Sequence, residues 1–170
     1  MRVLGIDPGI ATCGYGVIEA ADGEWRLVVA GAIRPTQRGA ARLQELYKAM
    51  RAILAAHRPN AAAVELLYHN RNVKTAADVG QARGVAMLAL VQAGIDIAEY
   101  TPTQMKLAIT GNGAADKGQV QRLVAMRLRL AYPPQPDDAA DALGLCLCYV
   151  QAIGLRQRVA QAMGAGTLAR

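Results

Sequence analysis

The sequence predicts an α/β fold, with a five-stranded mixed sheet (first three strands antiparallel) flanked by helices. Short apolar runs of strand length, such as Val3-Leu4-Gly5-Ile6 and Ala61-Ala62-Ala63-Val64, alternate with longer segments of helical periodicity. Three predicted strands come first with short connections, whereas helices separate the later strands. With 53% hydrophobic residues, the chain of 170 residues is expected to form a sizeable core.

The first three predicted strands form a meander. Residues 3–7, 14–19 and 24–33 have strand character, and Asp22-Gly23 is a turn signal between the second and the third. Because the connections are short, these strands are expected to be antiparallel neighbours.

The remaining elements alternate between helices and strands. Pro59, Gly94 and Pro133 each follow a helical segment and mark its end. Because helices connect them, the later strands are expected to run parallel to the first. The predicted order is helix 41–57, strand 61–67, helix 73–93, strand 95–100, a short helix between Thr101 and Gly111, helix 117–130 and helix 137–153.

One domain is expected to cover residues 1–154, followed by a flexible C-terminal tail at 155–170, where the sequence thins to Arg, Gln, Ala and Gly. No stretch has the apolar length expected of a bilayer span, and no secretory leader is evident. The three cysteines lack zinc-site spacing and are expected to be reduced thiols. These features predict a cytoplasmic protein.

The net charge of +6 indicates a polyanionic partner and favours nucleic acid over solubility alone. Within this basic chain, Asp7 and Glu65 end two apolar runs that are expected to be parallel strands. Asp138 and Asp141 lie one helical turn apart and share a helix face. If that helix docks at the carboxyl end of the sheet, the four carboxylates meet in one pocket.

An all-oxygen pocket of this kind suits Mg²⁺, with Mn²⁺ as a substitute. Four carboxylates cannot all remain ionised in a cleft without counter-charge, and two divalent ions would supply it while activating water for phosphodiester hydrolysis. Each acid also has a plainer interpretation as a turn or capping residue. Asp137 fits that interpretation best, as a helix N-cap after Pro136.

The chain resembles the RuvC family of crossover junction endodeoxyribonucleases, which resolve Holliday junctions. The resemblance covers nearly the whole chain except the tail, and it lies in the order and spacing of several motifs. These are Gly5-Ile6-Asp7-Pro8-Gly9, Gly14-Tyr15-Gly16-Val17-Ile18, Gly80-Gln81-Ala82-Arg83-Gly84-Val85-Ala86, the positions Lys106, Gly111, Gly113, Ala115, Lys117, Gln119 and Val120, and Asp138-Ala139-Ala140-Asp141-Ala142-Leu143.

The resemblance implies an RNase H-like fold, a homodimer and Mg²⁺-dependent nicking of two opposed strands of four-way junction DNA. It also implies work beside the RuvA–RuvB branch-migration complex. The family's catalytic and metal-binding carboxylates fall on Asp7, Glu65, Asp138 and Asp141. Two departures, Cys13 in place of a common Thr and Leu66 in place of a common Gln, remove no metal ligand.

Further residues are expected to contact DNA or a second copy of the chain. Lys106 and Lys117 flank a glycine turn that can approach a phosphate. An aromatic near the junction centre falls on Tyr68, which can stack on a base. Arg71 and Lys74 are placed to contact the DNA backbone, and His69 is more plausible as a surface residue. The apolar helix 73–93 is the expected dimer interface, through Val79, Ala82, Arg83, Ala86 and Leu90.

Two other functions remain open at this point. An actin-like nucleotide-binding ATPase also carries an acidic phosphate loop such as Asp7-Pro8-Gly9, although such proteins enclose the nucleotide between two domains. A non-catalytic junction-binding module would share the basic surface. ATP binding would identify the first, and binding without a metal-dependent product would identify the second.

Overall fold

The computed structural model describes residues 1–9, 11–66 and 73–167, and it leaves the side chains of 73–75 and 164–167 undescribed. Its sheet has the strand order β3-β2-β1-β4-β5. β1 (Arg2–Pro8), β2 (Cys13–Ala21) and β3 (Glu24–Ile33) are antiparallel neighbours, and β1, β4 (Ala61–Glu65) and β5 (Asp96–Tyr100) are parallel. The predicted mixed sheet and its antiparallel first three strands are confirmed.

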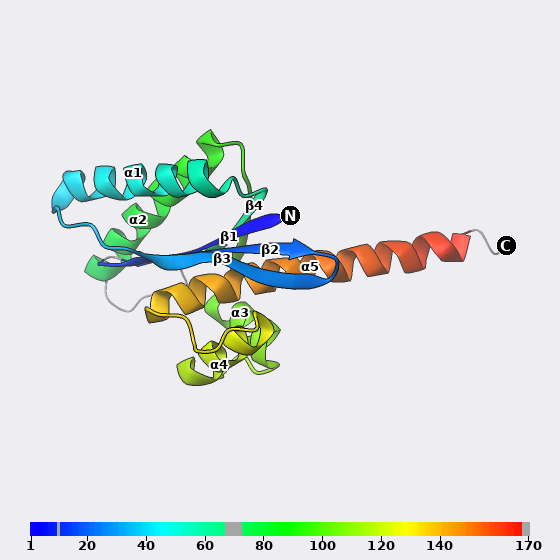
Figure 1. Cartoon of the computed structure of the whole chain (residues 1–170). Coiled ribbons are helices and arrows are strands. Elements are labelled where there is room, and N and C mark those ends of the chain that lie inside the picture. Colours follow the sequence, from blue (N-terminus) through cyan, green and yellow to red (C-terminus); the bar gives the residue numbers. More distant parts are fainter. Residues whose placement is uncertain (10, 67–72, 168–170) are drawn as a thin grey trace.

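Helices cover both faces of the sheet (Figure 1). α1 (Gly39–His57) and α2 (Val73–Gln92) lie on one face, and α5 (Asp137–Thr167) crosses the other, where α3 (Pro102–Thr110) and α4 (Lys117–Arg127) pack against it. Strand residues alternate between the two cores: Val3 faces α5, whereas Leu4 faces α1 and α2.

Large side chains fill the core under α1 and α2. Leu46, Met50 and Leu54 of α1 are buried there, and their i, i+4, i+8 spacing places them on one helix face. From α2, Ala86 and Leu90 meet them, both with no exposed surface. This face is a conventional side-chain core.

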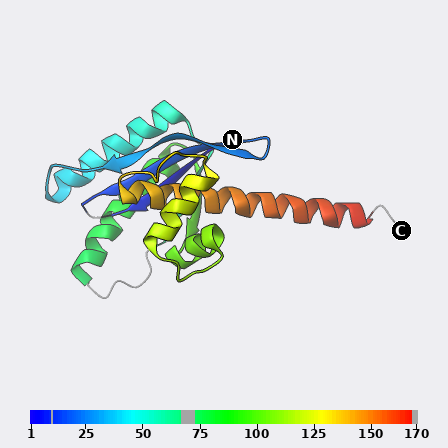
Figure 2. The ribbon, with the colours of Figure 1, turned by 60° about the horizontal axis from the view of Figure 1, so that its bottom comes forward.

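α5 continues to Thr167, so residues 155–167 are helical and the predicted end of this helix at Ile153 was wrong. Beyond Gly154 it projects from the body of the domain, and its side chains are exposed from Leu155 to Met163 (Figure 2). Alanine, glutamine and arginine favour helix, whereas one internal glycine costs only about 1 kcal/mol. The composition of residues 155–167 is therefore compatible with a continuing helix.

α5 also corrects the expectation that no stretch has the length and apolarity of a membrane span. By length and composition alone, Asp137–Met163 qualifies. However, 56% of the qualifying window is buried inside the domain. α5 is apolar on several sides because it lies between the sheet and the α3–α4 pair, as core helices of globular proteins do.

Candidate active site

Two carboxylates stand side by side at the carboxyl ends of the central strands. Ile6 of β1 pairs in parallel with Val64 of β4, so the next residues, Asp7 and Glu65, emerge together. Their side chains are within hydrogen-bonding reach of each other. The sheet register therefore places both acids as the sequence predicts.

Glycines bring the start of α5 onto this end of the sheet. A Cβ atom added at Gly14, which pairs with Asp7 across β1 and β2, would lie 2.1 Å from the Asp138 carbonyl oxygen and 2.8 Å from the Asp138 Cβ. A Cβ added at Gly5 would lie 1.8 Å from the Ala142 carbonyl oxygen. The α5 backbone thus rests directly on the strands, which brings Asp138 and Asp141 within electrostatic reach of Asp7.

The carboxyl groups raise one another's pKa. Burial, followed by the charge of Glu65 and then those of Asp141 and Asp138, raises the pKa of Asp7 to about 8. Burial also raises the pKa of Glu65 and of Asp141. The protein without metal therefore keeps a proton between Asp7 and Glu65 at neutral pH, as expected for neighbouring carboxyls that lack counter-charge.

Two lysines supply part of that counter-charge. The Nζ atom of Lys117, at the start of α4, lies 3.3 Å from Asp137 Oδ2 and 3.8 Å from Asp141 Oδ2. Burial lowers the pKa of Lys117, but the charges of Asp141 and Asp137 together raise it by more. The net shift of this pKa is therefore upward. Lys106 of α3 is close enough to lower the pKa of Asp141. Lys117 therefore lies beside Asp137 and Asp141, and Lys106 lies within electrostatic reach of Asp141.

Asp137, which the sequence suggests only as a helix N-cap, also connects α4 to α5. It is the first residue of α5, and it accepts a hydrogen bond of 2.8 Å from Gln121 Nε2 in addition to its ion pair with Lys117. These contacts tie α4 to the start of α5 and hold Lys117 near Asp141. In the sequence, only the two adjacent acids Asp137 and Asp138 point to a special role for the start of α5.

The donor set fits a hard divalent cation, although it is not arranged around one. Within residues 1–9, 11–66 and 73–167, no three acidic, histidine or cysteine side chains are grouped at metal-binding geometry. Instead, Asp7 faces Glu65, and Asp141 faces Lys117. A proton and a lysine now provide the charge balance that a cation would provide.

The structure gives no view of several predicted DNA contacts. Tyr68, His69 and Arg71 lie outside the described residues, and the side chain of Lys74 is not described. All three cysteines are free and buried, in agreement with the expected reduced thiols. Burial raises the pKa of the Cys13 thiol to about 12, and the nearby charges of Asp7 and Asp138 add to the shift.

Most of the residues expected at a dimer interface face inward. Val79, Ala82, Ala86 and Leu90 are at most 8% exposed, and the last three pack in the core beneath α1. Arg83 forms an ion pair with Glu99 of β5. Val79, Ala82, Ala86 and Leu90 are therefore too buried to contact a second copy, which corrects the prediction for these four residues. Arg83, whose side chain is 21% exposed, stays a predicted contact. Among the described side chains of α2, the exposed large apolar ones are Leu88 and Val91, at 52% and 64%.

Comparisons with known proteins agree with this geometry. The family model described as "Crossover junction endodeoxyribonuclease RuvC" matches residues 3–149. A curated protein of that name from Chloroflexus aggregans is 52% identical over 161 residues, which cover 93% of this chain and 98% of the relative. Another from Caldanaerobacter subterraneus subsp. tengcongensis is 45% identical over 94% of this chain and 98% of the relative.

Solved structures show the same fold. Thermus thermophilus RuvC in complex with a Holliday junction substrate matches with a TM-score of 0.83 and 33% identity, over 88% of this chain and 93% of that chain. The yeast mitochondrial Holliday junction resolvase Ydc2 matches with a TM-score of 0.62 at 10% identity, which concerns the fold alone. The RNase H-like fold implied by the family resemblance is confirmed.

Proposed function

The chain belongs to the family of RuvC crossover junction endodeoxyribonucleases, and we propose that it resolves Holliday junctions at a catalytic centre formed by Asp7, Glu65, Asp138 and Asp141. It is an endodeoxyribonuclease of homologous recombination and DNA repair. The observation that carries the proposed centre is the meeting of four carboxylates from three distant segments at one end of the sheet. The actin-like and non-catalytic alternatives are not favoured, because the family match covers nearly the whole chain.

The carboxylates would hold Mg²⁺, with Mn²⁺ as a substitute and two ions per site. Nucleases of this family are metal-dependent, and such ions activate water and stabilise the leaving oxygen in phosphodiester hydrolysis. Asp7 and Glu65 provide oxygen ligands from the sheet, and Asp138 and Asp141 provide them from α5. Binding would displace the proton that Asp7 and Glu65 now share.

The chain's residues also orient the reacting phosphate. Water attacks the phosphorus in line with the 3′-oxygen, the bond to that oxygen breaks, and 5′-phosphate and 3′-hydroxyl ends result. Lys117, held by Asp137 and next to Asp141, stabilises the charge that develops on the phosphate oxygens. Lys106 adds a second positive charge on the same side.

Paired nicking of two opposed strands requires two centres, so we propose a homodimer. The exposed face of α2 is the candidate contact, because Leu88 and Val91 are exposed there and a Cβ added at Gly80 or Gly84 would meet nothing within 4 Å. Tyr68, Arg71 and Lys74 remain proposed DNA contacts. A cytoplasmic location and cooperation with the RuvA–RuvB branch-migration complex complete the proposal.

Nicking of a synthetic four-way junction by the Asp7→Asn variant tests the proposed centre. In Mg²⁺, the wild-type protein should give symmetric paired nicks, and EDTA should abolish them. Asp7→Asn should reduce nicking by at least about 1000-fold and leave junction binding within a few fold. Arg26→Gln, at an exposed position near the end of β3 that lies away from the four acids, is the matched control and should nick at the wild-type rate. Wild-type nicking by Asp7→Asn would refute the assignment.

A further inference from the structure

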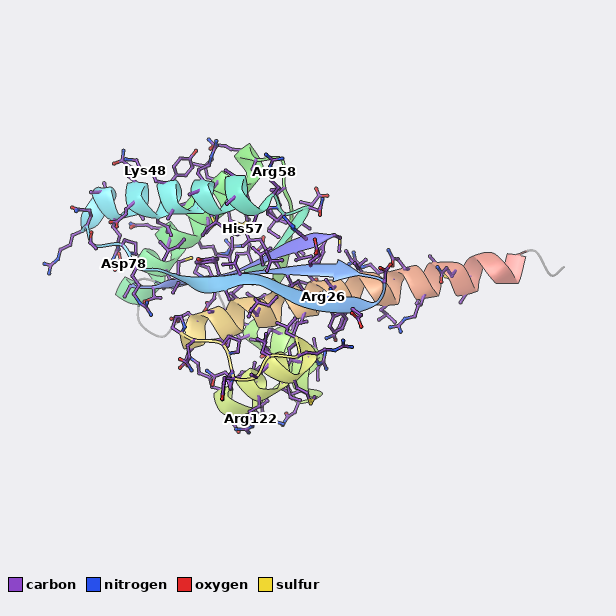
Figure 3. All side chains as sticks on the ribbon, in the orientation of Figure 1. Arg26, Lys48, His57, Arg58, Asp78 and Arg122 are labelled. Carbon is purple, nitrogen blue, oxygen red and sulfur yellow. The ribbon has the colours of Figure 1, made fainter. Side chains whose placement is uncertain are left out.

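The positive charge of the chain is concentrated in two segments on opposite faces of the sheet. Residues 101–136 carry five basic residues and one acid, and they include Lys106 and Lys117 of the proposed centre. Residues 34–58 carry six basic residues and one acid, and most of this segment is α1. Figure 3 shows Lys48 and Arg58 at the outer edge of α1, in the layer opposite to Arg122 of α4. The proposed active site therefore leaves a second basic surface unused.

Most of these cations have no acidic partner within the described part of the chain. Arg42 pairs with Asp78 at 3.6 Å. The single acid, Glu45, accepts hydrogen bonds from the backbone N–H groups of Thr36 and Gln37 and thereby fixes the loop that precedes α1. Five exposed residues of this segment form no ion pair within the described part of the chain. They are here called the α1 basic row: Arg34, Arg38, Lys48, Arg51 and Arg58.

The α1 basic row begins at the catalytic end of the sheet and runs away from it. Ile33 ends β3 opposite Cys13, and Cys13 pairs with Pro8, which follows Asp7. Arg34 is thus at the same sheet end as the acids. α1 has 19 residues and so extends for about 28 Å, which is about the length of 8 base pairs of duplex.

A surface pocket marks the far end of the row. It has a volume of about 360 Å³ and lies between the carboxyl ends of α1 and α2, with Arg51 and Arg58 on its wall and Gln92 beside them. The Gln92 side-chain oxygen already accepts a hydrogen bond from Tyr47, so its amide N–H groups can donate to a ligand. Two guanidinium groups and an amide form a donor set suited to phosphate.

The character of this surface distinguishes nucleic acid from a protein partner. Protein interfaces depend on exposed apolar and aromatic anchors. None of the large, exposed hydrophobic side chains within the described chain belongs to residues 34–58. Contacts to a DNA backbone need only cations and hydrogen-bond donors, and they are independent of sequence.

We propose that the α1 basic row binds the phosphate backbone of a duplex arm of the junction, several base pairs away from the strand exchange point. This inference rests on the proposed function and adds the part of the substrate that α1 contacts. The centre at the sheet end would hold the crossover, while the row holds the arm that leaves it along α1. The row would add affinity and fix the direction of the arm without acting on the chemical step.

Binding and footprinting of long-armed junctions without metal test this inference. A triple variant, Lys48→Gln, Arg51→Gln and Arg58→Asn, removes three charges. Asparagine is used at position 58 because it tolerates the left-handed backbone there (φ 46°). The matched control, Arg26→Gln, Arg156→Gln and Arg158→Gln, removes three charges from the hairpin and the projecting part of α5.

At physiological salt, the α1 variant should bind a junction with arms of about 25 base pairs at least about tenfold more weakly than the control, and its log–log salt slope should be about 2–3 units shallower. Hydroxyl-radical protection should disappear along one arm and persist at the crossover. Nicking at saturating enzyme in Mg²⁺ should stay within about twofold of wild type.

Three results would overturn the inference. Equal affinity and an equal footprint of the variant and the control would assign the row to another ligand, such as an acidic protein. Loss of protection at the crossover, or an equal fall in affinity for a junction with arms of only about 6 base pairs, would make the row part of the surface that binds the junction core. If the wild-type protein nicks no junction at all, the proposed function fails, and that failure is visible before any α1 variant is compared.

Discussion

The two faces of the sheet are covered in different ways. Under α1 and α2, side chains such as Leu46 and Met50 separate the helices from the strands. Under α5, glycines at positions 5, 14 and 16 let the helix approach so closely that added Cβ atoms would lie 1.8–2.6 Å from α5 atoms. One face tolerates small adjustments of its side chains. On the other face, the glycines fix the position of the helix that carries Asp138 and Asp141, so the proposed active site requires that these strand positions have no side chains.

The largest predicted effect on activity is at Gly14. In Gly14→Ala, the new methyl group would meet the Asp138 backbone, which must move because an atom cannot remain 2.1 Å from that oxygen. A displacement of about 1 Å in a catalytic group costs about 100-fold in rate. Single-turnover nicking, normalised to the folded fraction, should therefore fall at least about 100-fold.

Leu46→Ala on the opposite face is the matched comparison. It should lower the free energy of unfolding by about 2–4 kcal/mol, because it leaves a cavity beneath α1. Nicking per folded molecule should remain within about twofold of wild type. Normal nicking by folded Gly14→Ala would contradict the role of the α5 face in positioning the acids. A loss of activity in Leu46→Ala beyond its folded fraction would show that the α1–α2 face contributes more than stability.

A smaller loss of activity is expected at Lys117. Lys117→Gln removes a positive charge next to Asp141 and should reduce nicking about 10–100-fold, with junction binding changed by less than about tenfold. Asp137→Asn keeps the contact with Gln121 and weakens only the hold on Lys117, so its loss should be about three- to tenfold. Equal effects of both changes on binding, with no effect on the nicking rate of bound junction, would restrict Lys117 to a DNA contact.

The buried carboxyl group of Asp7, next to Glu65, should make the free energy of unfolding depend on pH when metal is absent. The pKa of Asp7 is raised from 3.8 to about 8 in the folded protein, so the folded state binds the extra proton. Its contribution to stability is complete below the unfolded pKa and is lost as the pH rises through about 8. Urea unfolding in EDTA should show a loss of about 2 kcal/mol between about pH 6 and about pH 8.

Two variants separate the origin of this pH dependence. Asp7→Asn should flatten the profile and stabilise the metal-free protein near pH 8, whereas Leu46→Ala should lower the whole curve without changing its slope. Mg²⁺ should restore wild-type stability at the alkaline end. A stability that rises between about pH 6 and about pH 8 in EDTA would contradict the shared proton.

The sequence was sufficient for the sheet and for the position of the acids within it. Apolar runs ending in Asp7 and Glu65 predicted two parallel strand ends, and the spacing of Asp138 and Asp141 predicted one helix face. Periodicity and topology determine such features, and both can be read locally. The glycines at 5, 14 and 16 were visible too, but their meaning required knowing which helix lies above them.

The predictions that failed concern what lies beyond one element. The periodicity of α2 could not show that Ala82, Ala86 and Leu90 face the core of their own chain, because an apolar helix face can meet either a sheet or a second copy. The helical end of α5 was missed because Gly154 was taken as its limit. The role of Asp137 depends on where α4 packs, which no spacing within α5 reveals.

Anomalous diffraction from crystals soaked in Mn²⁺ is the most direct measurement of the proposed metal centre. Manganese density should appear between the sheet end and α5, with oxygens of Asp7, Glu65 and at least one of Asp138 and Asp141 at about 2.0–2.3 Å. It should be absent in Gly14→Ala crystals under the same conditions. Manganese bound elsewhere, or no bound manganese in crystals of an enzyme that nicks junctions in the same buffer, would contradict a metal centre built by seating α5 on glycines.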